Sequence, residues 1–153
     1  MSINVVLYQP EIPPNTGNII RLCANTGANL HLVKPLGFDL DDARLRRAGL
    51  DYHEFARVQV HERIQQVIDA HPTSPVYALT TKGSRAYTDV QYGSDDILLF
   101  GPETRGLPQD MLDGFDPAQC LRIPMLRDSR SLNLSNAVAV VVYEAARQLN
   151  TLG

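Results

Sequence analysis

Two segments of this chain carry polar residues in patterns that a hydrophobic core does not require. Residues 98–108 read LLFGPETRGLP, and residues 122–136 read RIPMLRDSRSLNLSN. In each segment a short apolar run leads into glycine, proline, hydroxyl, amide and charged residues. Loops at strand ends are where α/β proteins hold their ligands. The two segments therefore predict one shared pocket.

A third pattern, Asn15-Thr16-Gly17 followed by Arg21, lies near the N-terminus. It is compatible with a capped helix that happens to carry an arginine. It is equally compatible with an anion site, in which Gly17 lets backbone N–H groups approach a phosphate and Arg21 offers a guanidinium fork. The residues alone leave both interpretations open.

The two later segments have the same ambiguity. Residues 101–106 could be a strand-to-helix turn that needs its glycines for positive φ, or a loop whose two glycines give a ligand access to the backbone. Residues 127–133 could be a solvated loop, or a site in which Arg127 and Arg130 bind phosphate while Ser131 and Asn133 hydrogen-bond a ligand.

The elements that must position these segments alternate between strand and helix, which predicts an α/β fold with a mostly parallel, six-stranded sheet and helices on both faces. One domain over residues 1–153 suits this length. Asn15 or Thr16, and Ser135-Asn136, are the expected helix caps, and residues 81–94 give no clear prediction. The expected strands are 3–8, 30–33, 58–61, 76–80, 97–100 and 120–123, and the expected helices are 15–24, 39–49, 64–70, 108–112 and 135–149.

The last expected helix is apolar on every side over residues 137–143. One sheet in a small domain covers only one face of a helix. Leaving several valines exposed would forgo about 1.5–3 kcal/mol each. The pattern therefore predicts that a second subunit covers the other face, as a homodimer.

Composition limits the possible functions. The net charge of −3 argues against coating nucleic acid by bulk charge. Cys23 and Cys120 lie far apart in apolar surroundings and are expected to be reduced thiols. No signal peptide and no apolar run of about 20 residues is present, so we expect a cytoplasmic protein with no membrane contact. The four histidines lack ligand spacing, so no metal site is expected, and the glycine fingerprint of dinucleotide-binding enzymes, the P-loop and the G-x-S-x-G elbow are absent.

The three polar patterns, in this order, resemble the SPOUT superfamily of RNA methyltransferases. The first match is Asn15-x-Gly17-x-x-x-Arg21, the second is residues 99–106, and the third begins at Ile123-Pro-Met and continues through Ser131-Leu-Asn133. The short length and the opening residues 5–18 are most similar to members that methylate the ribose 2′-oxygen of the tRNA wobble nucleotide, position 34, cytidine or modified uridine.

The resemblance implies a C-terminal trefoil knot, a recognised exception to un-knotted topology, with S-adenosylmethionine bound in it. It implies a homodimer packed through the first and last helices, with Arg21 reaching the partner's cofactor, and the tRNA anticodon stem-loop as substrate. The RNA-contacting residues would be Asn15, Arg21, Arg127 and Arg130. The cofactor-binding residues would be Leu79, Thr80, Gly101, Glu103, Gly106, Ile123, Met125, Ser131, Leu132 and Asn133.

For catalysis the resemblance points to Arg21. A guanidinium is a poor base because its pKa exceeds 12, so we expect Arg21 to grip a phosphate and stabilise the developing alkoxide. Glu103, Tyr143 or a phosphate oxygen is left as the proton acceptor. The alternatives are a non-catalytic RNA-binding or assembly factor on the same scaffold and a nucleotide-dependent oxidoreductase. The sequence does not assign a role to Arg44, Arg46 and Arg47, which are equally compatible with a solvated helix face.

Overall fold

The fold is built on one parallel sheet. The computed structural model, which describes residues 2–153, orders seven strands as β3-β2-β1-β6-β4-β7-β5, and each pairing among them is parallel. The strands are β1 (Asn4–Tyr8), β2 (Asn29–Val33), β3 (Gln59–His61), β4 (Val76–Leu79), β5 (Arg85–Ala86), β6 (Ile97–Phe100) and β7 (Cys120–Arg122).

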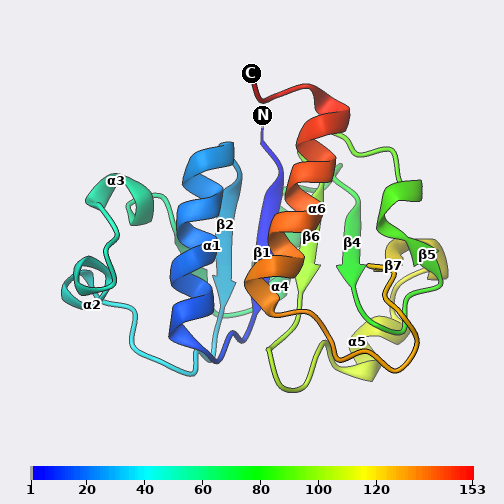
Figure 1. The fold of residues 1–153 in the computed structure, drawn as a ribbon, viewed down its shortest axis with the longest axis horizontal. Helices are drawn as coiled ribbons and strands as arrows, with labels where there is room; N and C mark the ends of the chain where they lie inside the picture. Colours follow the sequence, from blue (N-terminus) through cyan, green and yellow to red (C-terminus); the bar gives the residue numbers. More distant parts are fainter. Residues whose placement is uncertain (1) are drawn as a thin grey trace.

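Helices cover both faces of the sheet, as the sequence predicts. In β1, Val5 and Leu7 pack in one core cluster with α1 (Pro13–Thr26) and α6 (Leu134–Leu149), while Val6 packs in the other with α4 (Ile64–Ala70) and α5 (Gln109–Asp113). Successive side chains of a strand point to opposite faces of the sheet. Because both faces are covered by helices, the central strands need apolar residues at consecutive positions. Figure 1 shows α1 and α6 side by side in front of the sheet.

The sheet has seven strands where six were expected. The additional strand β5 lies at the sheet edge, within the stretch that gave no prediction, and pairs only two residues with β7. Two residues are too few to show a period of two. The remaining helices, which the sequence gave only in part, are α2 (Asp42–Arg47), α3 (Tyr52–Phe55) and the short 3₁₀ turns η1 (Tyr87–Asp89) and η2 (Pro117–Gln119).

Two predicted helix caps are wrong. α1 begins at Pro13, with Ile12 before it, because proline suits the first position of a helix; Asn15 and Thr16 are buried inside its first turns. α6 is capped by Asn133, whose side chain accepts from the backbone N–H of Ser135 at 2.9 Å. α1 ends with Gly27 as its C-terminal cap, in the left-handed conformation with φ 77°, beyond the end at residue 24 that the sequence predicted.

Most of the apolar surface of α6 is already buried within this chain, so less of it is left for a second subunit than its composition suggests. Val138, Val141 and Val142 are buried within the chain, because α1 packs along α6 as well as the sheet beneath it. The outward strip that remains contains half-buried Val140 and Tyr143, which is 47% exposed. The apolar argument for a second subunit therefore rests on this narrower strip.

The carboxyl ends of the parallel strands meet at one edge of the sheet, the lower edge in Figure 1. The loops after β4, β6 and β7 gather there, close to the N-terminal end of α6. This edge is where ligands bind in open parallel sheets. None of the helices in residues 2–153 is long and apolar enough to cross a membrane.

Candidate functional site

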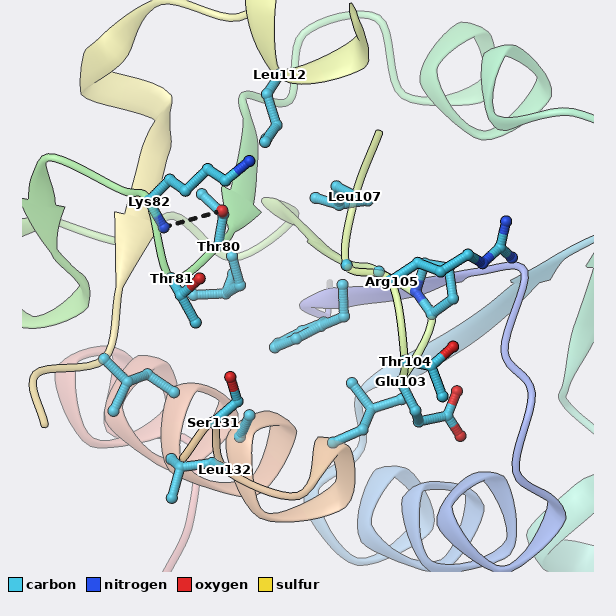
Figure 2. A pocket seen from close by; sticks show the side chains of 18 of the residues that line it. Thr80, Thr81, Lys82, Glu103, Thr104, Arg105, Leu107, Leu112, Ser131 and Leu132 are labelled. Carbon is cyan, nitrogen blue, oxygen red and sulfur yellow. Dashed lines mark hydrogen bonds between the residues drawn. The ribbon is translucent and has the colours of Figure 1, made fainter. Parts of the chain in front are cut away.

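A cavity of about 280 Å³ lies at the carboxyl ends of β4, β6 and β7. Figure 2 shows its wall: Thr80, Thr81 and Lys82 come from the loop after β4, and Ser131 and Leu132 from the segment before α6. The loop after β6 supplies residues 101–107. A cavity near 300 Å³ with apolar walls and a few polar groups is typical of a site for one small ligand.

Nine of the ten residues expected to bind the cofactor line this cavity, and the exception is Asn133. The structure adds residues that the sequence reasoning missed. Some lie in residues 81–94, which gave no prediction, or in α5, which was not linked to the site, and others lie within residues 98–108 but were not assigned to the cofactor. The nine are Leu79, Thr80, Gly101, Glu103, Gly106, Ile123, Met125, Ser131 and Leu132, and the added residues include Thr81, Lys82, Phe100, Arg105, Leu107 and Leu112.

The glycines of the second motif shape the loop after β6. A Cβ on Gly101 would lie 2.4 Å from the backbone nitrogen of Leu107, so no larger residue fits without moving the loop. Gly106 has φ 68°, a conformation that side chains disfavour. The loop therefore folds back on itself and presents main-chain groups to the cavity.

The loop after β6 and the start of α1 are joined by a reciprocal pair of carboxylates. Glu103 accepts from the backbone N–H groups of Glu11 and Ile12, each at 2.8 Å. Glu11 in turn accepts from the backbone N–H and the hydroxyl of Thr104, at 2.9 and 2.7 Å. The hydrogen bonds from Thr104 hold the pKa of Glu11 below its ordinary value. Each carboxylate thus accepts hydrogen bonds from backbone N–H groups of the other segment, and these bonds join residues 11–12 to residues 103–104.

Asn15 extends this link to the third motif. Its side-chain amide donates to Glu103 at 3.3 Å, and its carbonyl oxygen accepts from the amide of Asn133 at 3.0 Å. Asn15 is 6% exposed. The structure therefore makes buried Asn15 and exposed Asn133 a connection between the motifs, whereas the sequence placed Asn15 against RNA and Asn133 against the cofactor.

Arg21 does not line the cofactor-sized cavity of its own chain. Its Nε donates to Glu54 of α3 at 2.8 Å, and one terminal nitrogen contacts Glu54 and the carbonyl oxygen of Gly49. Glu54 raises the pKa of Arg21, and the arginine lowers the pKa of Glu54. Two of the three guanidinium nitrogens are therefore committed to fixing its direction, and the side chain is a permanent cation.

The other predicted residues stand apart from the cavity. Arg127 and Arg130 are exposed in the loop between β7 and α6. Tyr143 lies on the outward strip of α6. The structure thus brings together the second and third motifs at one cavity, whereas Arg21, Tyr143 and the two loop arginines do not line it.

Three histidines that are distant in sequence lie together: His31 in β2, His61 in β3 and His71 at the end of α4. Their spacing in the sequence did not reveal this. Nδ1 of His31 lies 3.0 Å from Nε2 of His61, and the ring of His71 is near. Burial lowers the pKa of His31 to about 4. His31 is therefore neutral and connects His61 to Asn4. Over residues 2–153, no group of three or more His, Cys, Asp or Glu residues has the arrangement of a metal site.

The pattern that defines the SpoU rRNA Methylase family matches residues 2–143. The chain belongs to this family. A tRNA (cytidine(34)-2'-O)-methyltransferase from Yersinia pestis is 62% identical over 156 residues, which cover 99% of this chain and 96% of that protein.

Solved structures agree with this membership. One, described as giving structural insights into the 2-OH methylation of C/U34 on tRNA, is 43% identical with a TM-score of 0.88 over 97% of each chain. The SpoU methyltransferase AviRb from Streptomyces viridochromogenes, solved with the cofactor AdoMet, is 26% identical with a TM-score of 0.81, and covers 98% of this chain and 58% of that one.

The sequence leaves Glu103 as a candidate proton acceptor, and its contacts in the structure predict the effect of replacing it. Glu103→Gln leaves one acceptor oxygen where two backbone N–H groups converge and turns an NH₂ group toward them. We expect the free energy of unfolding to fall by about 1.5–3 kcal/mol, the contribution typical of a hydrogen bond to a charged group.

Urea denaturation checks the effect of Glu103→Gln. Asp89→Asn is the control, because Asp89 is exposed and its carboxylate makes no hydrogen bond or ion pair with residues 2–153. A Glu103→Gln protein as stable as the wild type, with normal cofactor affinity but no turnover, would instead assign Glu103 a purely chemical role.

Proposed function

We propose that this SpoU family member is an S-adenosylmethionine-dependent tRNA methyltransferase that methylates the ribose 2′-oxygen of nucleotide 34, a cytidine or modified uridine. The observation that carries the proposal is the cavity at the strand ends, whose walls come from the second and third motifs. The full-length similarity to tRNA (cytidine(34)-2'-O)-methyltransferases supports the same substrate. We further propose that the whole chain forms one cytoplasmic catalytic domain.

The residues present fit the cofactor. Phe100, Leu107 and Ile123 offer apolar surface to a purine ring, and the hydroxyls of Thr80 and Ser131 can hydrogen-bond a ribose or an amino-acid group. The fold-back at Gly101 presents main-chain groups at close range. When bound, the sulfonium supplies an activated methyl group and leaves as a neutral thioether.

In the transfer, the ribose 2′-oxygen forms a bond to the methyl carbon as the carbon–sulfur bond breaks, and the hydroxyl proton goes to an acceptor. The protein contributes alignment and charge. Arg21, held by Glu54, would bind the adjacent phosphate through its free terminal nitrogen and stabilise the developing alkoxide. Because Glu103 already accepts three hydrogen bonds, we place the proton on a phosphate oxygen or on the phenolate form of Tyr143.

We propose that the active form is a homodimer through α1 and α6, with Arg21 of one subunit beside the cofactor cavity of the other. In support, Arg21 lies outside its own chain's cavity, and the outward strip of α6 carries exposed Tyr143. Arg127 and Arg130 would bind the anticodon stem-loop. We also propose that the loops after β6 and β7 form the trefoil knot of the superfamily, which is consistent with their meeting at one cavity.

The activity is tested by mass spectrometry of digested tRNA from cells with and without this protein. We expect the loss of one ribose methyl group at position 34, and its return in vitro when the purified protein, S-adenosylmethionine and the unmodified tRNA are mixed. Uptake of S-adenosylmethionine without transfer to any tRNA would refute the proposed reaction. RNA binding with no cofactor uptake would indicate a non-catalytic binding factor.

Replacing Arg21 with lysine should remove most of the activity. A lysine keeps the charge but cannot hold Glu54 and a phosphate with one planar fork. We expect kcat/KM for tRNA to fall by at least about 100-fold. The cofactor Kd should change little, because Arg21 lies outside its own chain's cavity and in the proposed dimer contacts the RNA phosphate rather than the cofactor. Exposed Arg63→Lys is the control. Wild-type turnover by Arg21→Lys would show that no guanidinium clamp is needed.

Subunit mixing tests the shared site. Arg21→Ala and Gly101→Ala should each be inactive, the second because its Cβ collides with the Leu107 backbone; Ser131→Trp, which obstructs the cavity from an exposed position, is a second cofactor-site variant. Co-refolded mixtures should regain up to about a quarter of wild-type activity, because half of the dimers are mixed and each of those has one intact site. Mixtures that stay inactive while forming mixed dimers would place both groups in one subunit's site.

A further inference from the structure

A second cavity, of about 310 Å³, lies between the first turns of α1 and residues 38–50. Its volume is close to that of the cofactor cavity, and it is large enough for one small ligand. Nothing in the reaction derived above occupies it. Its walls include Thr16, Gly17, Arg21, Phe38, Leu45 and Leu50.

The wall of this cavity carries a buried hydroxyl without a partner. Thr16 is 1% exposed, and its Oγ1 has no hydrogen-bond partner among residues 2–153. A buried polar atom normally has a partner, so each exception calls for an explanation. Thr16 lines the cavity, but its Oγ1 is itself covered. A polar ligand group would therefore supply the missing bond only after the wall of the cavity opens slightly at this residue.

The chemistry of the walls divides into two parts. Phe38, Leu45 and Leu50 make part of the wall apolar. Arg21 and Arg44 add guanidinium groups, and Asp39 adds a carboxylate. Arg44 is held by Asp39 and Asp41, at 3.6 and 3.2 Å, in the way that Glu54 holds Arg21. A planar ring with polar edges, attached to a phosphate, matches this combination of surfaces.

We propose that the second cavity binds the base of the RNA nucleotide whose ribose is methylated, turned out of the anticodon loop. The base lies between Phe38 and the leucines, a polar edge of the base bonds to the Thr16 hydroxyl, and the phosphate lies at Arg21. At Gly17 the missing side chain lets the ring approach the helix backbone. This inference rests on the proposed function, and it assigns a substrate-binding role to the segment that contains α2.

The location also suits the chemistry. An enzyme that acts on a nucleotide within a folded RNA gains access by extruding it into a pocket. The turn of α1 that carries Thr16 and Gly17 also carries Asn15, which is bonded to Glu103 on the wall of the cofactor cavity. The proposed base site therefore lies on a helical turn that is fixed by the cofactor loop of its own chain, while in the proposed dimer the methyl donor beside Arg21 belongs to the partner subunit.

The first test removes only the hydroxyl. Thr16→Val keeps the shape of the side chain and eliminates an unpaired buried polar atom, so its melting temperature should equal or exceed that of the wild type. We expect KM for an anticodon stem-loop RNA to rise about 10-fold, with KM for S-adenosylmethionine unchanged. The control is Thr88→Val, at an exposed position. An unchanged KM for the RNA would overturn the role of Thr16.

The second test fills the cavity from its rim. Ala48 is exposed and lines the cavity, so Ala48→Phe obstructs it without disturbing the core. We expect a loss of RNA affinity of at least 10-fold, and none for Ala70→Phe, at an exposed position outside the cavity. If Ala48→Phe changes the sedimentation mass of the protein but leaves RNA affinity intact, the cavity belongs to a protein interface and the proposal is wrong.

A crosslink locates the base directly. Stem-loop RNA with 5-iodocytidine at the nucleotide that is methylated is irradiated with the full-length protein, and the crosslinked peptide is sequenced by mass spectrometry. We expect it within residues 38–50, and a crosslink confined to residues 123–133 would overturn the inference. This result does not depend on turnover: absent methylation with a crosslink at 38–50 refutes the proposed reaction alone, whereas methylation with a crosslink elsewhere refutes only the base pocket.

Discussion

The hydrogen-bonded chain from Glu103 through Asn15 to Asn133 is the constraint on which the site depends. It joins residues separated by 88 and 118 positions in the sequence, and Asn133 also caps α6 through Ser135. One buried amide therefore fixes the cofactor loop, the start of α1 and the start of α6 relative to each other. A network of this kind is strong only when each member is satisfied, which explains why polar residues occupy positions where a core would place apolar ones.

The segment from α2 to α3 has a comparable role for Arg21. Glu54 closes a capping box with the backbone of Asp51 and uses both oxygens to hold the guanidinium. A short helix that would be marginal alone is thus tied to α1 by an ion pair and by Leu50 in the core. The segment positions the cation and also forms the second cavity, so both features depend on its docking against α1.

Much of this arrangement is predictable from the sequence, for reasons that are physical. Buried parallel strands are long apolar runs, as in β6 and in β1 after Asn4, and the motif residues lie at strand ends. The fold class and a cavity at the strand ends therefore follow from the sequence. What pattern alone could not give are contacts between distant residues. The pairing of Arg21 with Glu54, the burial of Asn15 and the two-residue strand β5 arise from tertiary packing, which overrides local preference.

The separation of Arg21 from the cofactor cavity has an electrostatic rationale. A sulfonium and a guanidinium are both cations, and in a site shielded from water their repulsion is larger than in solution. In the proposed dimer each chain binds its own cofactor, while the arginine comes from the other chain and is already paired with Glu54. An RNA phosphate that lies between the two cations attracts both and offsets their repulsion. RNA binding and assembly of the catalytic site would thereby be coupled, which links chemistry to the presence of the correct substrate.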